Sequence, residues 1–356
     1  MRGLVLEQVR RIALRDDLPE PVIEVPTDVV VEVTVAGLCG SDLHPYRGHE
    51  PARTGVVTGH ELVGEIVAAG SAVTSVGVGD RVLAAFSTSC GHCRPCRRGL
   101  TARCTQGQLF GWGPPGPDAA APLAGAQAER IRVPLADGTL LRVPDDIDDV
   151  TALLLADNLP TAVEAVDRTG ITPDQPLVVV GLGAVGLLTV LAAVDAGAAP
   201  ILAVDPVGDR QRRAELIGVT RACGPEEAPA VLAGLLDDGE DGAAAVVEAA
   251  GTIPAQRLAV ELTRPGGTLS TIAAQTADAF ALTPVEAYDR NLSLRFGRAS
   301  ARVTTEPLLH RVATGDLSVP TEVVVTHLDV PLEQGPALYE RFDAREDGLL
   351  KAVFRP

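Results

Sequence analysis

Lysine is almost absent from this chain of 356 residues: Lys351, near the C-terminal end, is the only one. Chemistry that depends on lysine, such as a Schiff base or the phosphate contact of a Walker loop, is therefore very hard to place in this protein. A catalytic Tyr-x-x-x-Lys pair is excluded as well, because none of the three tyrosines is followed by lysine four residues later. Aromatic residues make up only 3% of the chain, so alanine, valine and leucine must do most of the packing.

Positive charge and long apolar runs are also scarce. The formal net charge of -17 argues against a nucleic acid or an anionic membrane as a partner, since both require clustered lysine and arginine. The longest apolar stretch, residues 187–204, is interrupted by Asp195 and Pro200, whereas a membrane span needs roughly 20 uninterrupted apolar residues. The first residues lack the apolar core of a signal peptide. We therefore expect a cytoplasmic protein that does not bind membranes.

Four of the six cysteines lie close together, within residues 90–104. Their spacing, C-x2-C-x2-C-x7-C, allows four thiolates to converge on one tetrahedral zinc ion with no open position, which is typical of a structural site. A disulfide framework is the alternative, but a reducing cytosol favours the metal. The expected ligands are Cys90, Cys93, Cys96 and Cys104. Cys223 has no ligand-like neighbour and is expected to be a plain buried thiol.

A second metal site is indicated by Cys39 together with the Gly-His-Glu triplet that ends in His60 and Glu61. A lone cysteine with histidine and carboxylate partners suggests an open zinc site, in which the ion can polarise a substrate oxygen. A histidine buried for structural reasons is the plainer alternative for His60.

The segment GLGAVG matches a dinucleotide-binding fingerprint. It follows an apolar strand at residues 177–180 and opens an apolar helix, which is the context that the fingerprint requires. Asp205 lies at the end of the next strand, where an acid binds both adenosine ribose hydroxyls and repels a 2′-phosphate, so the expected cofactor is NAD. Arg210 is a further candidate, although an exposed helix arginine is an equal alternative. The loop residues expected to hold the pyrophosphate at the helix N-terminus are Gly181, Leu182, Gly183, Ala184, Val185 and Gly186.

Strand and turn patterns dominate the first third of the chain, notably at residues 29–40, 61–70 and 76–86. A proline-rich stretch at residues 114–117 predicts a surface loop. The character then changes, because residues 151–166 are expected to be helical with a break near Pro160.

Between residues 177 and 297, strands alternate with helices, which indicates a parallel sheet. Residues 323–330 return to strand character. We therefore expect an α/β fold in which a doubly wound Rossmann domain, residues 151–294, is inserted into a mostly β catalytic domain. The catalytic domain would comprise residues 1–150 and 295–356.

Jointly, the segments GLCGSDLH, GHE, ADNLPTA, GLGAVG and VVTH, with the four-cysteine run, resemble the zinc-dependent medium-chain dehydrogenase/reductase family, the alcohol dehydrogenases. The resemblance covers essentially the whole chain and implies a GroES-like catalytic domain. It also implies that Cys39, His60 and Asp157 bind the catalytic zinc, with Glu61 able to bind it while water or substrate exchanges. A helix N-cap is the alternative role for Asp157.

The resemblance further implies a proton relay and a fixed tautomer of the histidine ligand. Ser41 and His44 have the Cys-x-Ser-x-x-His spacing of the family's relay, although His44 could also be a surface histidine. Asp42 resembles the acid that orients His60. Thr161, in the ADNLPTA segment, is assigned to the cofactor site.

The family's substrate pocket maps onto Phe86, Leu109, Phe110 and Trp112, with Asn158 beside the zinc. Several aromatic side chains and few charges favour an apolar primary or secondary alcohol, or its aldehyde or ketone, as the small-molecule substrate. We therefore expect an oxidoreductase that uses two Zn²⁺ ions per chain and NAD. A polyol or sugar-type dehydrogenase of the same family and a non-catalytic zinc and NAD-binding protein are the alternatives.

Self-association is expected because this family pairs subunits through the late strands of the Rossmann sheet. The apolar segments 266–274 and 292–297 correspond to those strands. An unpaired apolar edge strand is an aggregation hazard, so we expect a homotetramer or a homodimer.

Overall fold

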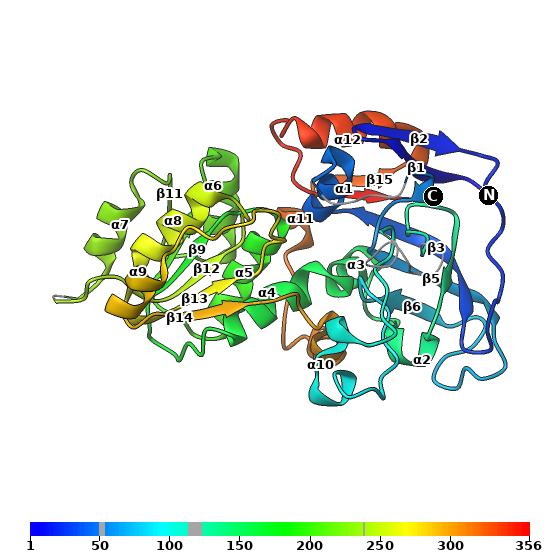
Figure 1. Ribbon diagram of the computed structural model, residues 1–356, viewed down its shortest axis with the longest axis horizontal. Coiled ribbons are helices and arrows are strands. Elements are labelled where there is room, and N and C mark those ends of the chain that lie inside the picture. The colour runs from blue at the N-terminus through cyan, green and yellow to red at the C-terminus, as the bar shows by residue number, and fades with distance from the viewer. Residues whose placement is uncertain (50–53, 113–122, 238) are drawn as a thin grey trace. The chain divides into compact units, whose positions relative to one another are not determined.

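The computed structural model describes residues 1–49, 54–112, 123–237 and 239–356 and divides into two compact units (Figure 1). The first unit contains Met1–Pro160, Ser300–Thr321 and Val325–Pro356, and the second contains Thr161–Ala299 and Glu322–Val324. The first unit thus extends ten residues beyond the expected boundary at residue 150. The reason is helix α3 (Asp149–Ala156), which packs against strands of the first unit.

Mostly antiparallel strands form the first unit, in a three-stranded sheet of order β2-β1-β4 and a seven-stranded sheet of order β15-β16-β3-β5-β6-β8, with β7 also paired to β3. The central strand β3 is rich in valine, which suits a pleated, half-buried surface. Its side chains join a hydrophobic core that also contains Tyr339 and Phe354. The strands are β1 (Gly3–Gln8), β2 (Arg11–Arg15), β3 (Val29–Leu38), β4 (Val56–Val57), β5 (Leu62–Ala69), β6 (Arg81–Ala84), β7 (Arg130–Val133), β8 (Leu140–Arg142), β15 (His327–Val330) and β16 (Ala352–Phe354).

Short helices follow the strands of this unit. The 3-10 turn η1 (Gly40–Asp42) and helix α1 (Leu43–Arg47) come directly after β3. Helix α3 begins at an N-cap, Asp148, whose carboxylate accepts the N–H groups of Val150 and Thr151. The remaining helices are α2 (Ala136–Thr139), α10 (Ala301–Ala313) and α12 (Gly335–Asp343).

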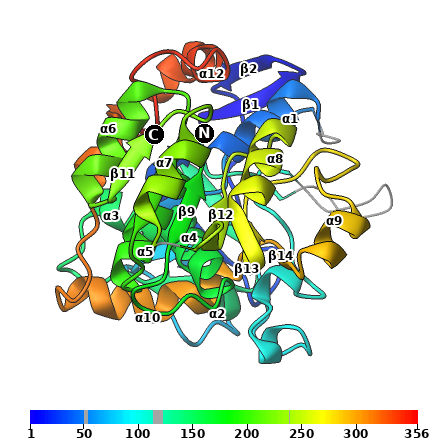
Figure 2. The same ribbon diagram turned by 90° about the vertical axis from the view of Figure 1, so that its left-hand side faces the viewer.

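A six-stranded parallel sheet of order β11-β10-β9-β12-β13-β14 forms the second unit. Figure 2 faces this unit, in which β9, β12 and β13 lie side by side. The central strands β9 (Leu177–Val180) and β10 (Ile201–Val204) are apolar and fully buried, as expected for a sheet covered on both faces. The strand order is that of a doubly wound Rossmann fold, with the switch point between β9 and β12.

The other strands of this sheet are β11 (Arg221–Cys223), β12 (Ala243–Glu248), β13 (Thr263–Thr271) and β14 (Ser293–Phe296). The helices of the second unit that lie between its strands are α5 (Ala184–Asp195), α6 (Gly208–Ile217), α7 (Ala228–Leu235), α8 (Ile253–Leu262) and α9 (Pro284–Asp289). The predicted fold class, a Rossmann sheet inserted in a mostly β domain, is confirmed.

Two predicted elements differ from the structure in their bounds. The helical stretch breaks at Asp157, between α3 and α4 (Asn158–Asp167), three residues before Pro160, because a proline is tolerated in the first turn of a helix. The strand predicted at residues 323–330 is shorter, because helix α11 (Thr321–Val324) occupies its first part and β15 begins only at His327. The proline-rich stretch at residues 114–117 lies outside the described residues.

Within the described ranges, none of the helices combines the length and the apolar character needed to cross a membrane.

Candidate functional site

The four residues predicted at the open metal site come together from three places in the first unit. Cys39 follows β3, His60 and Glu61 precede β5, and Asp157 lies between α3 and α4. Their ligand atoms all lie within 4.8 Å of one another. Asp157 Oδ2 is 3.6 Å from Cys39 Sγ and 3.6 Å from His60 Nε2. Two ligands about 2.2 Å from one tetrahedral zinc ion lie about 3.5 Å apart, so the residues fit this metal.

Asp42 orients the histidine of this cluster. Its Oδ1 lies 2.9 Å from His60 Nδ1, and its Oδ2 accepts the N–H of Cys39 at 2.9 Å. Burial alone would lower the pKa of His60, but the charge of Asp42 and the hydrogen bonds to Asp157 and Asp42 raise it well above its ordinary value. With Nδ1 directed at Asp42, Nε2 is the ring nitrogen available to a metal.

Asp42 is itself held by a buried polar network. Gln127 Nε2 lies 3.5 Å from Asp42 Oδ2 and donates to the carbonyl of Gly37 at 2.9 Å. Gln127 Oε1 accepts the hydroxyls of Thr58 at 2.6 Å and Tyr339 at 2.8 Å. The orientation of the histidine ligand therefore depends on side chains from two loops, after β4 and before β7, and from α12.

Two further side chains contact the cluster of metal-ligand residues: Asn158, which was expected beside the zinc, and Lys351, whose place the sequence did not reveal. Lys351 Nζ donates to Glu61 Oε2 at 2.5 Å. Asn158 Nδ2 donates to Glu61 Oε1 at 2.8 Å and to Asp157 Oδ2 at 3.0 Å. Burial would lower the pKa of Lys351, but the charge of Glu61 raises it. The singularity of Lys351 in the sequence was the one signal that could have drawn attention to it.

The thiol of Cys39 does not readily ionise to a thiolate unless a positive charge lies nearby. Burial, followed by the charge of Glu61, raises the pKa of Cys39. Burial also raises the pKa of Glu61. Cys39, Glu61 and Asp157 are three acidic groups that lie close together in a buried place. Their negative charges require positive charge nearby, which a bound divalent cation would supply.

Only one of the two predicted relay residues touches the cluster. Ser41 Oγ lies 3.2 Å from Cys39 Sγ and 3.2 Å from His60 Nε2. His44 lies in α1, half-buried, and its Nδ1 has no hydrogen-bond partner among the residues that the structure describes. Burial, followed by the charges of His49 and Arg47, lowers the pKa of His44.

The predicted substrate-pocket residues lie in different surroundings. The Trp112 ring stacks on His60, with 5.3 Å between the ring centroids, so this aromatic lies beside the metal cluster. Phe86, which follows β6, is buried. Leu109, which is bridged to the next residue, Ser87, is half-buried. Phe110 is fully buried in the hydrophobic core of the unit, and its assignment to the pocket stays a prediction. Asn158 is also fully buried and contacts Glu61 and Asp157, so it belongs to the metal cluster.

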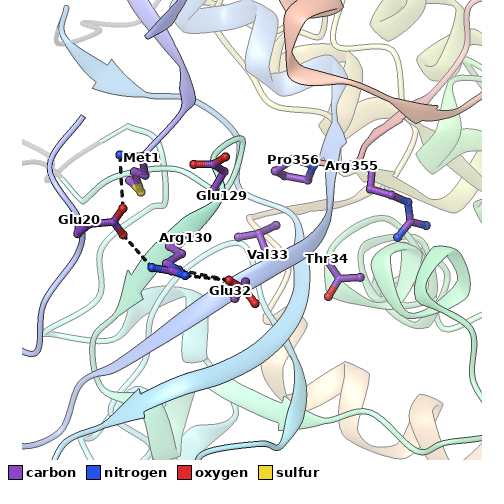
Figure 3. Close-up of a pocket in the computed structure, with 9 residues that line it drawn as sticks. All are labelled: Met1, Glu20, Glu32, Val33, Thr34, Glu129, Arg130, Arg355 and Pro356. Atoms are coloured by element: carbon purple, nitrogen blue, oxygen red, sulfur yellow. Dashed lines mark hydrogen bonds and ion pairs between the residues drawn. The ribbon is translucent and has the colours of Figure 1, made fainter. Parts of the chain in front are cut away.

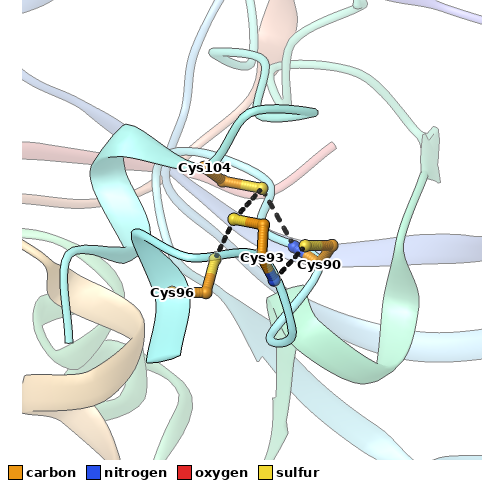
Figure 4. A group of neighbouring side chains, drawn as sticks. All are labelled: Cys90, Cys93, Cys96 and Cys104. Atoms are coloured by element: carbon orange, nitrogen blue, oxygen red, sulfur yellow. Dashed lines mark hydrogen bonds between the residues drawn. The ribbon is translucent and has the colours of Figure 1, made fainter. Parts of the chain in front are cut away.

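The four-cysteine lobe forms a second cluster of thiols (Figure 4). Cys93 Sγ lies 3.4 Å from Cys96 Sγ and 3.9 Å from Cys104 Sγ. The N–H of Cys93 donates to Cys90 Sγ at 3.3 Å, and N–H donors of this kind stabilise thiolates. Hydrogen bonds from the backbone of Cys96 and Thr105 lower the pKa of Cys93 to about 6. All six cysteines are free thiols, which removes the disulfide alternative.

The glycine loop of the second unit has the geometry that a dinucleotide requires. Gly181 has φ +94°, and a Cβ there would lie 2.8 Å from Ala250 Cβ. A Cβ on Gly186 would lie 1.9 Å from the carbonyl oxygen of Gly181, so the first turn of α5 needs glycine for close packing. Gly183 is the N-cap of α5 and has open space where its side chain would be, as the approach of a pyrophosphate needs.

The acid at the end of β10 is held against this loop. Asp205 Oδ2 accepts the N–H of Leu182 at 2.8 Å, and Oδ1 accepts the N–H of Val207 at 2.9 Å. Arg210 Nη1 lies 3.7 Å from Asp205 Oδ2. Thr161, the remaining predicted cofactor residue, is buried in α4.

A polar cavity of about 490 Å³ in the first unit is a separate feature (Figure 3). Four of its charged groups pair with one another: Arg130 lies 3.2 Å from Glu20 and 3.0 Å from Glu32, and the N-terminal amine of Met1 lies 3.5 Å from Glu20. None of its nine lining residues is a predicted site residue.

Models of two protein families match most of the chain. "Alcohol dehydrogenase GroES-like domain" matches residues 25–145, and "Zinc-binding dehydrogenase" matches residues 184–312. The zinc-type alcohol dehydrogenase B of Aspergillus flavus is 35% identical over 100% of this chain and 81% of its own length. A protein of Mycobacterium tuberculosis named "Probable zinc-binding alcohol dehydrogenase" is 36% identical over 100% of this chain and 89% of its own. The solved structure of alcohol dehydrogenase TADH from Thermus sp. ATN1 has a TM-score of 0.90 and 33% identity, and the match covers 100% of this chain and 99% of that one.

Proposed function

Because this chain belongs to the zinc-dependent medium-chain dehydrogenases, the alcohol dehydrogenases, we propose that it transfers a hydride between an apolar alcohol, or its carbonyl form, and NAD. The observation that carries the proposal is the convergence of Cys39, His60 and Asp157, from segments far apart in the sequence, at the spacing that one zinc ion requires. We further propose a structural zinc in the four-cysteine lobe, hence two ions per chain.

Three polar side chains in or near the open site have proposed tasks. A zinc ion bound there would supply a Lewis acid that polarises the substrate oxygen. Asp42 fixes the ring of His60 through Nδ1. Ser41, whose Oγ lies against Cys39 and His60, accepts the proton of the substrate hydroxyl and gives up its own hydroxyl proton. That proton would leave through the ribose of the bound cofactor, and His44 would pass it to solvent.

NAD is proposed over NADP because Asp205 places a negative charge at the end of β10, where the adenosine ribose of a Rossmann cofactor binds. The backbone donors Leu182 and Val207 hold this carboxylate in place. A 2′-phosphate at that position would meet like charge.

An apolar substrate is proposed from the aromatic ring of Trp112 beside His60 and from Phe86 in the neighbouring segment. A polyol is the second candidate, because a relative named "Probable D-xylulose reductase A", from Aspergillus clavatus, is 33% identical over 75% of this chain and 73% of its own length.

The test is NAD reduction with a panel of apolar alcohols and polyols, combined with metal analysis. We expect turnover that is faster with apolar alcohols, two zinc ions per chain, and loss of turnover together with one ion in Asp157→Ala. Faster turnover of polyols would favour the second candidate. Binding of NADH without turnover of any alcohol or aldehyde would instead indicate a non-catalytic zinc and nucleotide-binding protein.

A further inference from the structure

Glu61 is held at both of its carboxylate oxygens by side chains of this chain. Lys351 Nζ donates to Oε2 at 2.5 Å, and Asn158 Nδ2 donates to Oε1 at 2.8 Å. All three residues are buried, with exposed fractions of 0% for Glu61 and Asn158 and 1% for Lys351. The only lysine of the sequence thus forms an ion pair with this buried carboxylate.

Strand β3 provides the space in which this carboxylate lies. A Cβ added to Gly37 would lie 1.6 Å from Glu61 Oε2 and 2.8 Å from Glu61 Cδ. Gly37 is absent from the residues with positive φ, so the carboxylate, and not the backbone conformation, requires glycine here. Val353 of β16 pairs with Gly37 of β3. Lys351 lies two residues before Val353, so this pairing brings it close to the carboxylate of Glu61.

Glu61 also has a competing partner close by. Its ligand atom lies within 4.8 Å of those of Cys39, His60 and Asp157. A buried carboxylate without a counter-charge is strongly unfavourable, so a metal ion at that distance would attract it. Lys351 supplies the counter-charge, and the amide of Asn158 satisfies the other oxygen through a charge-assisted hydrogen bond.

We infer that Lys351, Asn158 and Gly37 form a clamp, the Glu61 clamp, which holds Glu61 off the catalytic metal and reserves the fourth coordination position for the substrate oxygen. The inference rests on the proposed function, because it needs a metal held by Cys39, His60 and Asp157. Lys351 and Asn158 are positioning residues that act through Glu61. When the clamp is loosened, Glu61 reaches the metal and competes with any external ligand.

The test uses the full-length protein loaded with Co²⁺, whose visible spectrum reports its ligands, and imidazole as the external ligand. A four-thiolate site has no open position, so a spectral change caused by imidazole comes from the site of Cys39, His60 and Asp157. We expect Lys351→Met to weaken the apparent affinity for imidazole by about tenfold or more, because a freed Glu61 occupies the same position. Gly37→Ala, which displaces the carboxylate directly, should weaken it in the same direction.

Two further variants separate this role from a loss of folding. Lys351→Arg keeps the charge and should bind imidazole nearly as the wild type does. The double variant Lys351→Met with Glu61→Gln removes both buried charges, so it should fold even where the single variant does not. It should regain affinity for imidazole, because no carboxylate remains to compete.

The inference is overturned if Lys351→Met, or Gly37→Ala where the former does not fold, binds imidazole as tightly as the wild type. It is also overturned if the double variant fails to recover the affinity. A wild-type cobalt spectrum that does not respond to imidazole at all would overturn the proposed open metal site, and the clamp with it.

Discussion

Asp205 is the residue that sets the expected cofactor preference. Its carboxylate is fixed by the N–H groups of Leu182 and Val207, and Arg210 Nη1 lies 3.7 Å from it. We expect kcat/KM to favour NAD over NADP by at least about tenfold, which corresponds to about 1.4 kcal/mol. Asp205→Ser should narrow the ratio, measured with both cofactors at one alcohol concentration. An equal or reversed ratio in the wild type would instead assign the choice to Arg210, and Arg210→Ala would then restore the preference for NAD.

Ser41 and His44 are the residues whose substitution tests the route of the proton. The lowered pKa of His44 keeps its imidazole neutral, and so able to accept a proton, further into the acid range. We therefore expect His44→Gln to slow alcohol oxidation most below about pH 7, where external bases are scarce. Ser41→Ala should lower kcat by about 10²-fold or more, because Ser41 Oγ is the hydroxyl next to Cys39 and His60.

Metal content and NADH affinity are the controls for both relay variants, and they should not change, since neither residue is a proposed ligand. An unchanged pH–rate profile in His44→Gln, with no rescue by added imidazole, would mean that the proton leaves by another route.

At the scale of elements, the four-cysteine lobe should depend on its metal for stability. It consists of short 3-10 turns, η2 (Cys96–Arg98) and η3 (Thr101–Arg103), that have little core of their own. We expect Cys96→Ala to lose one of the two ions and to lower the unfolding temperature, because a structural zinc contributes its binding free energy to folding. Cys223→Ala is the matched control, since Cys223 is a buried thiol in β11. Retention of both ions by Cys96→Ala would contradict the proposed lobe site.

Helix α2 is tied to the turn before β6 by one carboxylate whose effect depends on pH. Asp137 accepts the N–H of Thr74 at 3.0 Å and of Ser75 at 2.9 Å, as well as both hydroxyls. Partial burial works against ionisation, but these hydrogen bonds lower the pKa of Asp137 from 3.8 to about 2. A lowered folded-state pKa adds stability above pH 3.8 that disappears as the pH falls towards about 2.

Asp137→Asn should therefore lower the free energy of unfolding by about 1 kcal/mol at neutral pH, a modest value because the carboxylate is exposed to water. Urea titrations of both proteins between pH 7 and pH 2 would follow the difference. A difference that stays constant over this range would show that shape, and not charge, is what the carboxylate contributes.

For the whole molecule, self-association is the main expectation. Strand β14 is the edge of the parallel sheet, and Phe296 on it is 49% exposed. Helix α9, which precedes β14, also exposes apolar side chains, with Tyr288 at 82% and Val285 at 67%. An apolar edge of this kind favours pairing with a second copy. Light scattering at micromolar concentration should give a dimer or a tetramer of the 36.9 kDa chain, and Phe296→Asp should weaken it. A wild-type monomer would contradict this expectation.

The amino-acid sequence by itself determined the features that depend on local spacing. The four lobe cysteines lie within 15 residues, and the glycine loop has its strand and helix on either side, so both could be recognised without any knowledge of distant contacts. The alternation of strands and helices likewise indicated the parallel sheet, because the period of apolar residues reflects the element that buries them.

Only the tertiary structure decided which distant side chains meet. Lys351 is 290 positions from Glu61 in the sequence, and the two residues meet only because β16 pairs with β3. Phe110 packs into the core of the first unit. Asp157 interrupts the helical stretch with a non-helical conformation, φ −143° and ψ −61°, between α3 and α4. Sequence patterns record the environment of each residue along its own element, whereas contacts between elements depend on how the strands pair and pack.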